Sequence, residues 1–501
     1  MIRLRPLAVN ALSMVTSNVV IRGTTFLLYV LVARYLGVDA FGQLALGLAL
    51  AHSFRLIPSS GMQSQLVRSV ARRPQESASL FYNYSAVVFA MALATLLAQA
   101  VFVWCIGYSA ATTQIVMLLA LGVVPFCMSR VCESVLQAWE RMHLIAIAQT
   151  SINLVQLVGA LELVLAGYGI QAIGILIVSG LTLLAAVGAL IVLAVMKWPR
   201  VRFDLSAAGS ILRESATFFG IALVQAARAG MIVALLSIFA DERAVGLFSA
   251  ARQLLVPMTL LFESIALSVF PVFCKQSVMQ DVGRVAEFVI ELLLALSLPA
   301  VVLLTFYANG LLTLIYGSPD FSVAVPVAQI LAWILIAKPL SAILGQVLMA
   351  GSRERVNLRI VTVSAVVMLL VGPPLINGFG VQGAALTALV SLAVNVVYHY
   401  VAAAALVGGI SLRRNYRPLV AASGMAAAVL LLAQHHDLVS FAMATCVYLG
   451  VFIALAIRTP DDRELVRAVL AELRGKKKAS GGARRPQAAA PERNRQPVEV
   501  T

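Results

Sequence analysis

The sequence predicts an all-α polytopic membrane protein with about 14 transmembrane helices. Hydrophobic residues make up 61% of the 501 residues and charged residues 12%, outside the usual ranges for soluble domains. The mean hydropathy is +0.94. Apolar runs of about twenty residues recur along the chain, which is the length of a membrane-spanning helix, whereas barrel strands are short and alternating.

Polar breaks divide the chain into the predicted spans. The first span is too long for the apolar part of a signal peptide and contains Arg22, so we expect it to be retained. The penultimate span is short, and His435-His436-Asp437 is either a tip between two spans or a break in a re-entrant pair. The predicted spans cover 9–34, 41–65, 80–107, 114–137, 145–167, 173–196, 215–238, 245–272, 286–309, 322–349, 357–377, 381–407, 418–434 and 438–457.

An internal repeat predicts two lobes. The segment that begins at Leu31 is echoed by the segment that begins at Ala234, and Gly42 and Gly246 occupy matching places in the two copies. Six spans separate the copies, so both halves insert in the same orientation, as in transporters with a cleft between two rocking lobes. The alternative is a fortuitous likeness between apolar helices. The expected parts are an N-terminal lobe at 1–212, a C-terminal lobe at 213–412, an extra helix pair at 413–457 and a basic, disordered cytoplasmic tail at 458–501.

The positive charge is distributed as a topology signal. Most of the 37 lysines and arginines lie in alternate loops and in the tail, and the opposite loops carry only Arg243. This bias predicts that both termini are cytoplasmic. The net charge of +15 therefore requires no nucleic-acid partner, and the basic tail is expected to lie near membrane lipids.

Lone cations interrupt several spans. A guanidinium at membrane depth costs several kcal/mol unless it faces water or a partner. On the first, second, seventh and eighth spans, the cation shares a helix face with other polar residues, and Lys338 on the tenth span precedes Pro339. The predicted polar faces hold Asn18, Arg22, Thr25 and Tyr29; His52, Arg55, Ser59 and Gln63; Gln225 and Arg228; and Ser249, Arg252, Thr259 and Glu263.

These faces predict a cationic cavity between the lobes, lined by the first, second, seventh and eighth spans. Arginine pairs bidentately with phosphate, so the cavity suits an anionic ligand. The alternative is that each arginine neutralises a buried carboxylate or extends to an interface. The candidate substrate-binding residues are Arg22, Arg55, Arg228, Arg252, Lys338, Asn18 and Gln225.

Intramembrane carboxylates are candidates for a coupling ion. A desolvated glutamate can titrate near neutral pH, which makes Glu263, Glu162 and Glu291 possible proton or sodium sites. Structural pairing, for example of Glu263 with Arg55, is the alternative. The five cysteines lack metal-ligand spacing, so we expect neither a metal, nor a disulfide, nor a cofactor.

Enzymatic activity is not expected. The chain has no G-x-x-x-x-G-K-[ST] phosphate loop, and so lacks that machinery for ATP hydrolysis. A membrane polysaccharide polymerase or ligase is the rival class. Such an enzyme usually needs a sizeable outside loop, whereas the longest predicted here runs only over 309–320.

A set of short motifs extends in order over most of residues 9–405. The motifs are Val32-Ala33-Arg34-Tyr35-Leu36-Gly37 with Ala40-Phe41-Gly42, Ala244-Val245-Gly246-Leu247-Phe248-Ser249-Ala250-Ala251, Pro271, Leu314-Ile315-Tyr316-Gly317 with Phe321, and Gly380-Val381-Gln382-Gly383-Ala384-Ala385. Each motif is weak alone, but by their order and spacing the chain resembles the polysaccharide-export and O-antigen flippase branch of the multidrug/oligosaccharidyl-lipid/polysaccharide (MOP) superfamily.

The resemblance implies a flippase that moves an undecaprenyl-pyrophosphate-linked oligosaccharide across the bacterial inner membrane for exopolysaccharide, capsule or O-antigen synthesis. It also implies a polysaccharide polymerase and a chain-length regulator as partners. Spans thirteen and fourteen depart from the twelve-span pattern of this branch and resemble the lipid II flippases. A cation-coupled drug or metabolite antiporter is the main alternative, although organic cations would call for acidic groups in the cavity.

Overall fold

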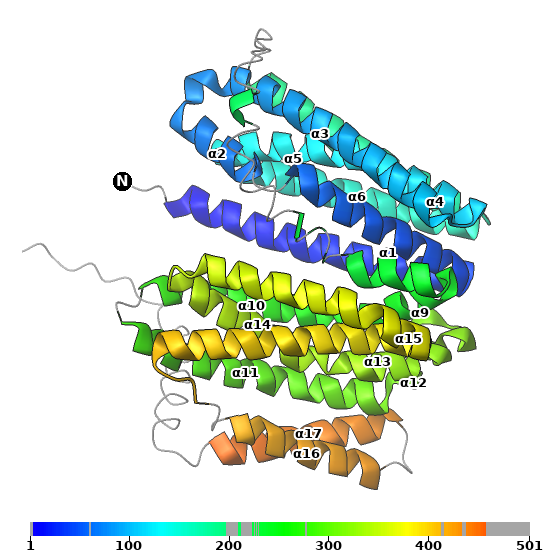
Figure 1. Cartoon of the computed structure of the whole chain (residues 1–501), viewed down its shortest axis with the longest axis vertical. Helices are drawn as coiled ribbons and strands as arrows, with labels where there is room; N and C mark the ends of the chain where they lie inside the picture. Colours follow the sequence, from blue (N-terminus) through cyan, green and yellow to red (C-terminus); the bar gives the residue numbers. More distant parts are fainter. Residues whose placement is uncertain are drawn as a thin grey trace, which may run out of the picture. The chain divides into compact units, whose positions relative to one another are not determined.

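The computed structural model describes residues 4–59, 62–196, 209–211, 223–224, 226, 228, 230–275, 278–411, 415–432 and 437–456. Every regular element within these ranges is a helix (Figure 1). Nine of the helices in the described ranges are long and apolar enough to cross a membrane, and three shorter ones are also apolar. The all-α polytopic fold predicted from the sequence is therefore confirmed.

The first half of the chain supplies the helices around the candidate site. They are α1 (Leu4–Ser59), α2 (Met62–Arg72), η1 (Pro74–Glu76), α3 (Ser77–Ile106), α4 (Ala110–Leu121), α5 (Val123–Ala138), α6 (Met142–Leu165) and α7 (Ile170–Val195).

The helices of the second half follow a stretch that is only partly described. They are α9 (Glu242–Gln253), α10 (Val256–Lys275), α11 (Met279–Phe306), α12 (Ala308–Tyr316), η2 (Pro319–Ala324), α13 (Val325–Ala332), α14 (Ile334–Ala350), α15 (Glu354–Val407), α16 (Tyr416–Leu431) and α17 (Asp437–Ala456).

Two helices are long enough to hold two predicted spans each, and each breaks at a glycine. α1 breaks at Gly37, with φ 83°, and α15 breaks at Gly380, with φ 56°. Positive φ is the left-handed region that glycine enters without a Cβ clash. The predicted pair 357–377 with 381–407 thus corresponds to one bent helix, α15. The pair 9–34 with 41–65 corresponds to the bent helix α1 up to Ser59, and the end of the second span lies in α2.

Three predicted spans are instead interrupted. The span 114–137 divides into α4 and α5 at Gly122, the span 322–349 divides into α13 and α14 at Trp333, and α9 ends two residues before α10 begins. Pro257 follows this last interruption in the first turn of α10, where its missing N–H leaves no helical hydrogen bond unmade. The interruption separates the two ends of the predicted polar face 249–263.

The first helix organises the packing of the site. α1 makes its most extensive contacts with α6, α9 and α4. Phe41, Phe248, Tyr316 and Phe321 are fully buried in the same core cluster. The Tyr316 ring stacks on Phe321 with centroids 4.5 Å apart, and its hydroxyl donates to the Ala250 carbonyl over 3.1 Å. The packing thus anchors the end of α12 to α9.

Contacts divide the chain into two compact units, Met1–Pro418 and Leu419–Thr501. The first unit contains both predicted six-helix lobes, and the division at 212/213 stays a prediction. In the second unit a Cβ at Gly424 would lie 3.9 Å from the side chains of Val447 and Val451, and Tyr448 stacks on Phe452. The predicted tail at 458–501 lies outside the described residues.

Candidate substrate cavity

A cavity of about 630 Å³ lies within the first unit. Its walls come from α1, α4, α5, α6, α7 and the last turns of α9. Much of its lining is polar although it is surrounded by apolar spans, so it offers hydrogen-bonding and charged groups to a ligand rather than a purely apolar surface. Among the residues predicted to bind substrate, Asn18, Arg55 and Arg252 line it.

Arg55 is held by an aromatic ring and an imidazole. Its guanidinium carbon lies 4.0 Å above the ring centroid of Phe126, a cation–π arrangement. Nη2 donates to His52 Nδ1 over 2.9 Å. Nε is buried and has no hydrogen-bond partner among the described residues, and none of their carboxylates forms an ion pair with this side chain. Arg55 therefore keeps a cationic donor for a ligand.

Arg252 supplies a second cation to the same cavity from α9. It forms no ion pair with a carboxylate of the described residues. Ser249, less than one turn earlier, also lines the cavity. Its buried Oγ has no hydrogen-bond partner among the described residues. Electrostatic interactions join Arg252 and Arg55 to both Tyr29 and His52, so the two cations act on one region of the cavity.

A third cation in the wall is neutralised. Arg130 and Glu133, one turn apart on α5, form an ion pair, and Arg130 Nη2 also donates to Gln63 Oε1 over 3.3 Å. Glu133 Oε1 accepts from Gln149 Nε2 on α6 over 2.7 Å. Arg130 therefore ties α5 to its neighbours and adds little free charge to the cavity.

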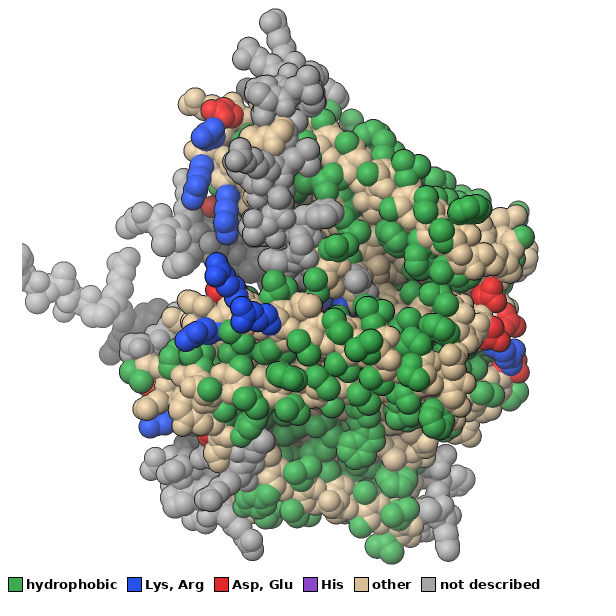
Figure 2. All heavy atoms as spheres, viewed as in Figure 1, with side chains coloured by type: hydrophobic (Ala, Val, Ile, Leu, Met, Phe, Trp, Pro, Cys, Tyr) green, Lys and Arg blue, Asp and Glu red, His purple; other side chains and the backbone are tan. Residues whose placement is uncertain are grey.

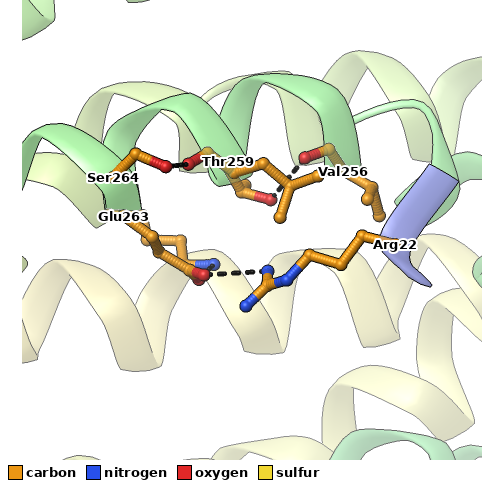
Figure 3. A network of polar contacts seen from close by, with 7 residues as sticks. Arg22, Val256, Thr259, Glu263 and Ser264 are labelled. Atoms are coloured by element: carbon orange, nitrogen blue, oxygen red, sulfur yellow. Dashed lines mark hydrogen bonds and ion pairs between the residues drawn. The ribbon is translucent and has the colours of Figure 1, made fainter. Parts of the chain in front are cut away.

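Arg22 lies outside the cavity lining. It belongs to a group of three charged side chains, Arg22, Glu263 and Lys338, which we call the Glu263 cluster. Figure 3 shows Arg22 extending from α1 to Glu263 on α10, with Nη1 3.0 Å from the carboxylate Oε2. Lys338 Nζ on α14 lies 3.2 Å from the other carboxylate oxygen. Glu263 thus pairs with Arg22 and Lys338 rather than with Arg55, which corrects the pairing suggested from the sequence.

One further candidate lies away from the cavity, and another is not among the described residues. Arg228 does not line it, and the electrostatic interaction that the structure records for Arg228 is with His399 on α15. Gln225 lies outside the described residues. The seven predicted binding residues are therefore divided between the cavity, the Glu263 cluster and the neighbourhood of His399, with Gln225 undescribed.

The other candidate coupling carboxylates have different surroundings. Glu291 is buried and pairs with Arg417 over 3.4 Å. Glu162 is exposed on α6 and has neither an ion pair nor a hydrogen bond from its side chain within the described part of the chain. The described residues contain no cluster of ligating side chains that could hold a metal ion.

A second polar cluster closes one end of the helices. Arg243 lies 3.6 Å from Asp39 and 3.7 Å from Asp320. The neighbouring Glu242 accepts hydrogen bonds from the hydroxyls of Thr112 over 2.7 Å and Ser109 over 3.1 Å. These contacts join the break in α1, the start of α4, the start of α9 and η2. We call these residues the Arg243 cluster.

Charged side chains gather at the ends of the helices. On the face shown in Figure 2, basic side chains gather at the end of the helices where α2 lies, and acidic side chains with a basic neighbour gather at the opposite end. The alternation of basic loops in the sequence predicts one basic end, and the cytoplasmic position of that end stays a prediction.

Sequence reasoning missed one wall of the cavity. Gln149, Asn153 and Gln156 of α6 line it beside Glu133. Their spacing of four and three residues places them on one helix face, a signal that is present in the sequence. A neutral amide carries no net charge, so within an apolar span it stands out less than an arginine does.

This fold and this cavity define a multi-pass helical membrane protein with a polar cavity among its spans. Residues 7–277, more than half of the chain, match the family described as polysaccharide biosynthesis protein, and the chain belongs to that family. A multidrug resistance MATE family transporter that shares the fold is named as a member of the MOP superfamily, which the sequence motifs resemble.

Individual relatives agree with the family match. The chain is 28% identical over 172 residues to the probable low-salt glycan biosynthesis flippase Agl15 of Haloferax volcanii, covering 34% of this chain and about a third (36%) of that relative's length.

Two solved structures share the fold. The lipid II flippase MurJ in an inward closed conformation matches with a TM-score of 0.76 and 15% identity, over 92% of this chain and 100% of that one. An inward-facing multidrug resistance MATE family transporter matches with a TM-score of 0.62 and 12% identity, over 77% of this chain and 95% of that one. None of these relatives is named as an enzyme.

Proposed function

We propose that this protein is a flippase for a lipid-linked oligosaccharide, and that the cavity receives its anionic headgroup. The observation that carries the proposal is that Arg55 and Arg252 line one cavity without a carboxylate partner among the described residues. Two cations that line a cavity among membrane spans without counter-charge are expensive unless water or a ligand meets them. A pyrophosphate would supply the missing charge through bidentate contacts.

The rest of the proposed substrate is what the resemblance of the sequence motifs implies. The lipid is undecaprenyl pyrophosphate in the bacterial inner membrane, and the glycan is a repeat unit for exopolysaccharide, capsule or O-antigen synthesis. Both termini are cytoplasmic, and a polysaccharide polymerase and a chain-length regulator are the proposed partners. The protein moves its substrate and changes no covalent bond.

The Glu263 cluster has a separate role in this proposal. Because Arg22 and Lys338 share one carboxylate, each of them is paired when no substrate is present, although Glu263 balances only one of the two positive charges. Glu263 is therefore a candidate coupling carboxylate, since its protonation would free two cations. Arg22, Lys338 and Arg228 remain candidate substrate contacts in another conformation of the carrier.

An antiporter for organic cations is the alternative function. Glu133 is the acidic residue that lines the cavity among the described residues, and it is paired with Arg130. A cationic drug entering this cavity would meet Arg55 and Arg252 unshielded, which is repulsive. The charge of the cavity therefore favours an anionic substrate.

Complementation tests the proposal. A strain lacking its own polysaccharide flippase would express the wild type, Arg55→Gln or Arg252→Gln at matched membrane levels, with surface polymer as the readout. The matched control is Arg73→Gln, because Arg73 lies in an exposed turn and pairs with Glu76.

We expect export with the wild type and the control, and loss of export with each cavity variant. Normal export by both cavity variants would contradict the role of the two arginines. Resistance to cationic drugs conferred by the wild type, without polymer export in hosts of differing polymer, would favour the antiporter.

A further inference from the structure

One face of α6 lines the cavity with three side-chain amides. Gln149, Asn153 and Gln156 contribute to its wall, whereas Leu154 and Val155, on the other side of the same helix, are 45% and 65% exposed. Neutral amides inside an apolar span are costly unless they are hydrogen-bonded. The amide face therefore requires an explanation beyond packing.

Each of the three amides is anchored through its nitrogen. Gln149 Nε2 donates to Glu133 over 2.7 Å, Asn153 Nδ2 donates to the Gln149 carbonyl over 2.8 Å, and Gln156 Nε2 donates to the Leu176 carbonyl over 3.0 Å. No hydrogen bond to any of the three side-chain carbonyl oxygens comes from the described residues. The wall thus presents fixed acceptors to the cavity.

Acceptors do not suit a pyrophosphate, which itself offers only acceptors at neutral pH. They suit hydroxyl and amide donors, of which an oligosaccharide has many. A polyprenyl tail needs neither donors nor acceptors. Of the three parts of the proposed substrate, the sugar is the one whose chemistry complements this wall.

The amide face continues from the cationic region. Arg55 has an electrostatic interaction with Arg130, Arg130 pairs with Glu133, and Glu133 accepts from Gln149. If the anionic group of a ligand binds at Arg55, the group bonded to that anion would therefore contact the amide face. In a lipid-linked oligosaccharide, that group is the first sugar.

We propose that Gln149, Asn153 and Gln156 form the subsite for the sugar nearest the pyrophosphate and determine which glycans the protein accepts. The inference rests on the proposed flippase function. Asn153 is the sharpest position to test, because its amide nitrogen bonds only to the backbone of its own helix. Its replacement therefore disturbs no contact between helices that the structure records.

The experiment compares two probes on the purified full chain. One probe is undecaprenyl pyrophosphate without sugar, and the other is the lipid-linked oligosaccharide extracted from a host strain that the wild type complements. Affinities would be measured for the wild type, Asn153→Leu, the conservative Asn153→Gln, and Val155→Ala as the control on the exposed face of α6.

We expect the wild type and Val155→Ala to bind the sugar-bearing probe more tightly than the bare lipid. Asn153→Leu should lower that preference about fivefold, the equivalent of one hydrogen bond of ~1 kcal/mol, with its affinity for the bare lipid unchanged. Asn153→Gln should retain part of the preference. Unchanged affinity for the bare lipid also shows that Asn153→Leu is folded.

Three results would overturn the subsite. The first is equal affinity of the wild type for the two probes. The second is an Asn153→Leu variant that prefers the sugar-bearing probe as strongly as the wild type does. The third is an Asn153→Leu variant whose affinities for the two probes fall by the same factor. Failure of the wild type to bind either probe would instead count against the proposed flippase function, and so the two failures are distinguishable.

Discussion

Gly42 of α1 and Gly246 of α9 lie in direct contact where the two helices cross. A Cβ at Gly42 would fall 1.9 Å from the carbonyl oxygen of Glu242, and a Cβ at Gly246 would fall 2.3 Å from the carbonyl oxygen of Val38. Since both obstacles are backbone atoms, no side-chain movement can relieve them. The crossing therefore depends on the absence of two side chains.

This crossing gives the first prediction. Gly42→Ala should lower the apparent melting temperature of the purified protein, because overpacking against backbone costs about 2 kcal/mol or more. The matched control is Gly23→Ala on the same helix, where a Cβ meets nothing within 4 Å. That control should be neutral or slightly stabilising, since alanine is the better helix former. Equal melting temperatures of the two variants would show that α1 and α9 do not cross in this way.

The Glu263 cluster predicts which of two variants is less stable. Glu263→Gln leaves Arg22 and Lys338 without their shared carboxylate, whereas Arg22→Gln leaves the pair of Glu263 and Lys338 intact. Glu263→Gln should therefore lower the apparent melting temperature more than Arg22→Gln. Thermal unfolding in detergent at low ionic strength measures both. The reverse order would mean that the three groups do not share one ion-pair network.

The buried pair of Glu291 and Arg417 is predicted to be structural. Both side chains are almost inaccessible, so Arg417→Met, by removing the cation that pairs with a buried carboxylate, should cost about 3–5 kcal/mol. The double variant Arg417→Met/Glu291→Leu should recover much of that loss. If instead the single variant keeps its stability but loses transport, Glu291 would be a coupling site as the sequence suggested.

The Arg243 cluster makes stability depend on pH. Hydrogen bonding from the Thr112 hydroxyl, with a smaller contribution from Ser109, lowers the pKa of Glu242 below its ordinary value of 4.5 despite partial burial. A lowered folded-state pKa stabilises the folded protein above the unfolded pKa, and this contribution is lost as pH falls through the folded pKa.

Glu242→Gln should therefore melt below the wild type at neutral pH, and the difference should shrink as pH falls below 4.5. Melting curves of the two proteins over this range measure the effect. A difference that stays constant with pH would show that the Glu242 charge does not contribute.

The sequence was sufficient for the fold because its signals are local. Apolar length located the spans, and the alternation of basic loops predicts one basic end of the bundle. The sequence also matched Gly42 with Gly246, and these residues meet in space. The interruption between α9 and α10 was missed because a short break within an apolar run leaves the average hydropathy almost unchanged.

The candidate site was harder to predict because pairing depends on contacts between distant segments. Arg22 and Arg55 look alike in the sequence, but Arg22 meets Glu263, which is 241 residues away, whereas Arg55 meets an aromatic ring and an imidazole. Helix periodicity shows which residues share a face. It does not show which carboxylate lies opposite, and that distinction decides which cations are left for a substrate.

The most direct test of the central claim is the binding of undecaprenyl pyrophosphate to the purified wild type and to the double variant Arg55→Gln/Arg252→Gln, with undecaprenol as the uncharged control lipid. The account predicts that the wild type binds the pyrophosphate far more tightly than the alcohol. In the double variant the affinity for the pyrophosphate should fall at least about a hundredfold, because two charge-assisted contacts of about 1.5–3 kcal/mol each are lost. Unchanged binding of the pyrophosphate by the double variant would contradict the claim that these two arginines hold the anionic headgroup.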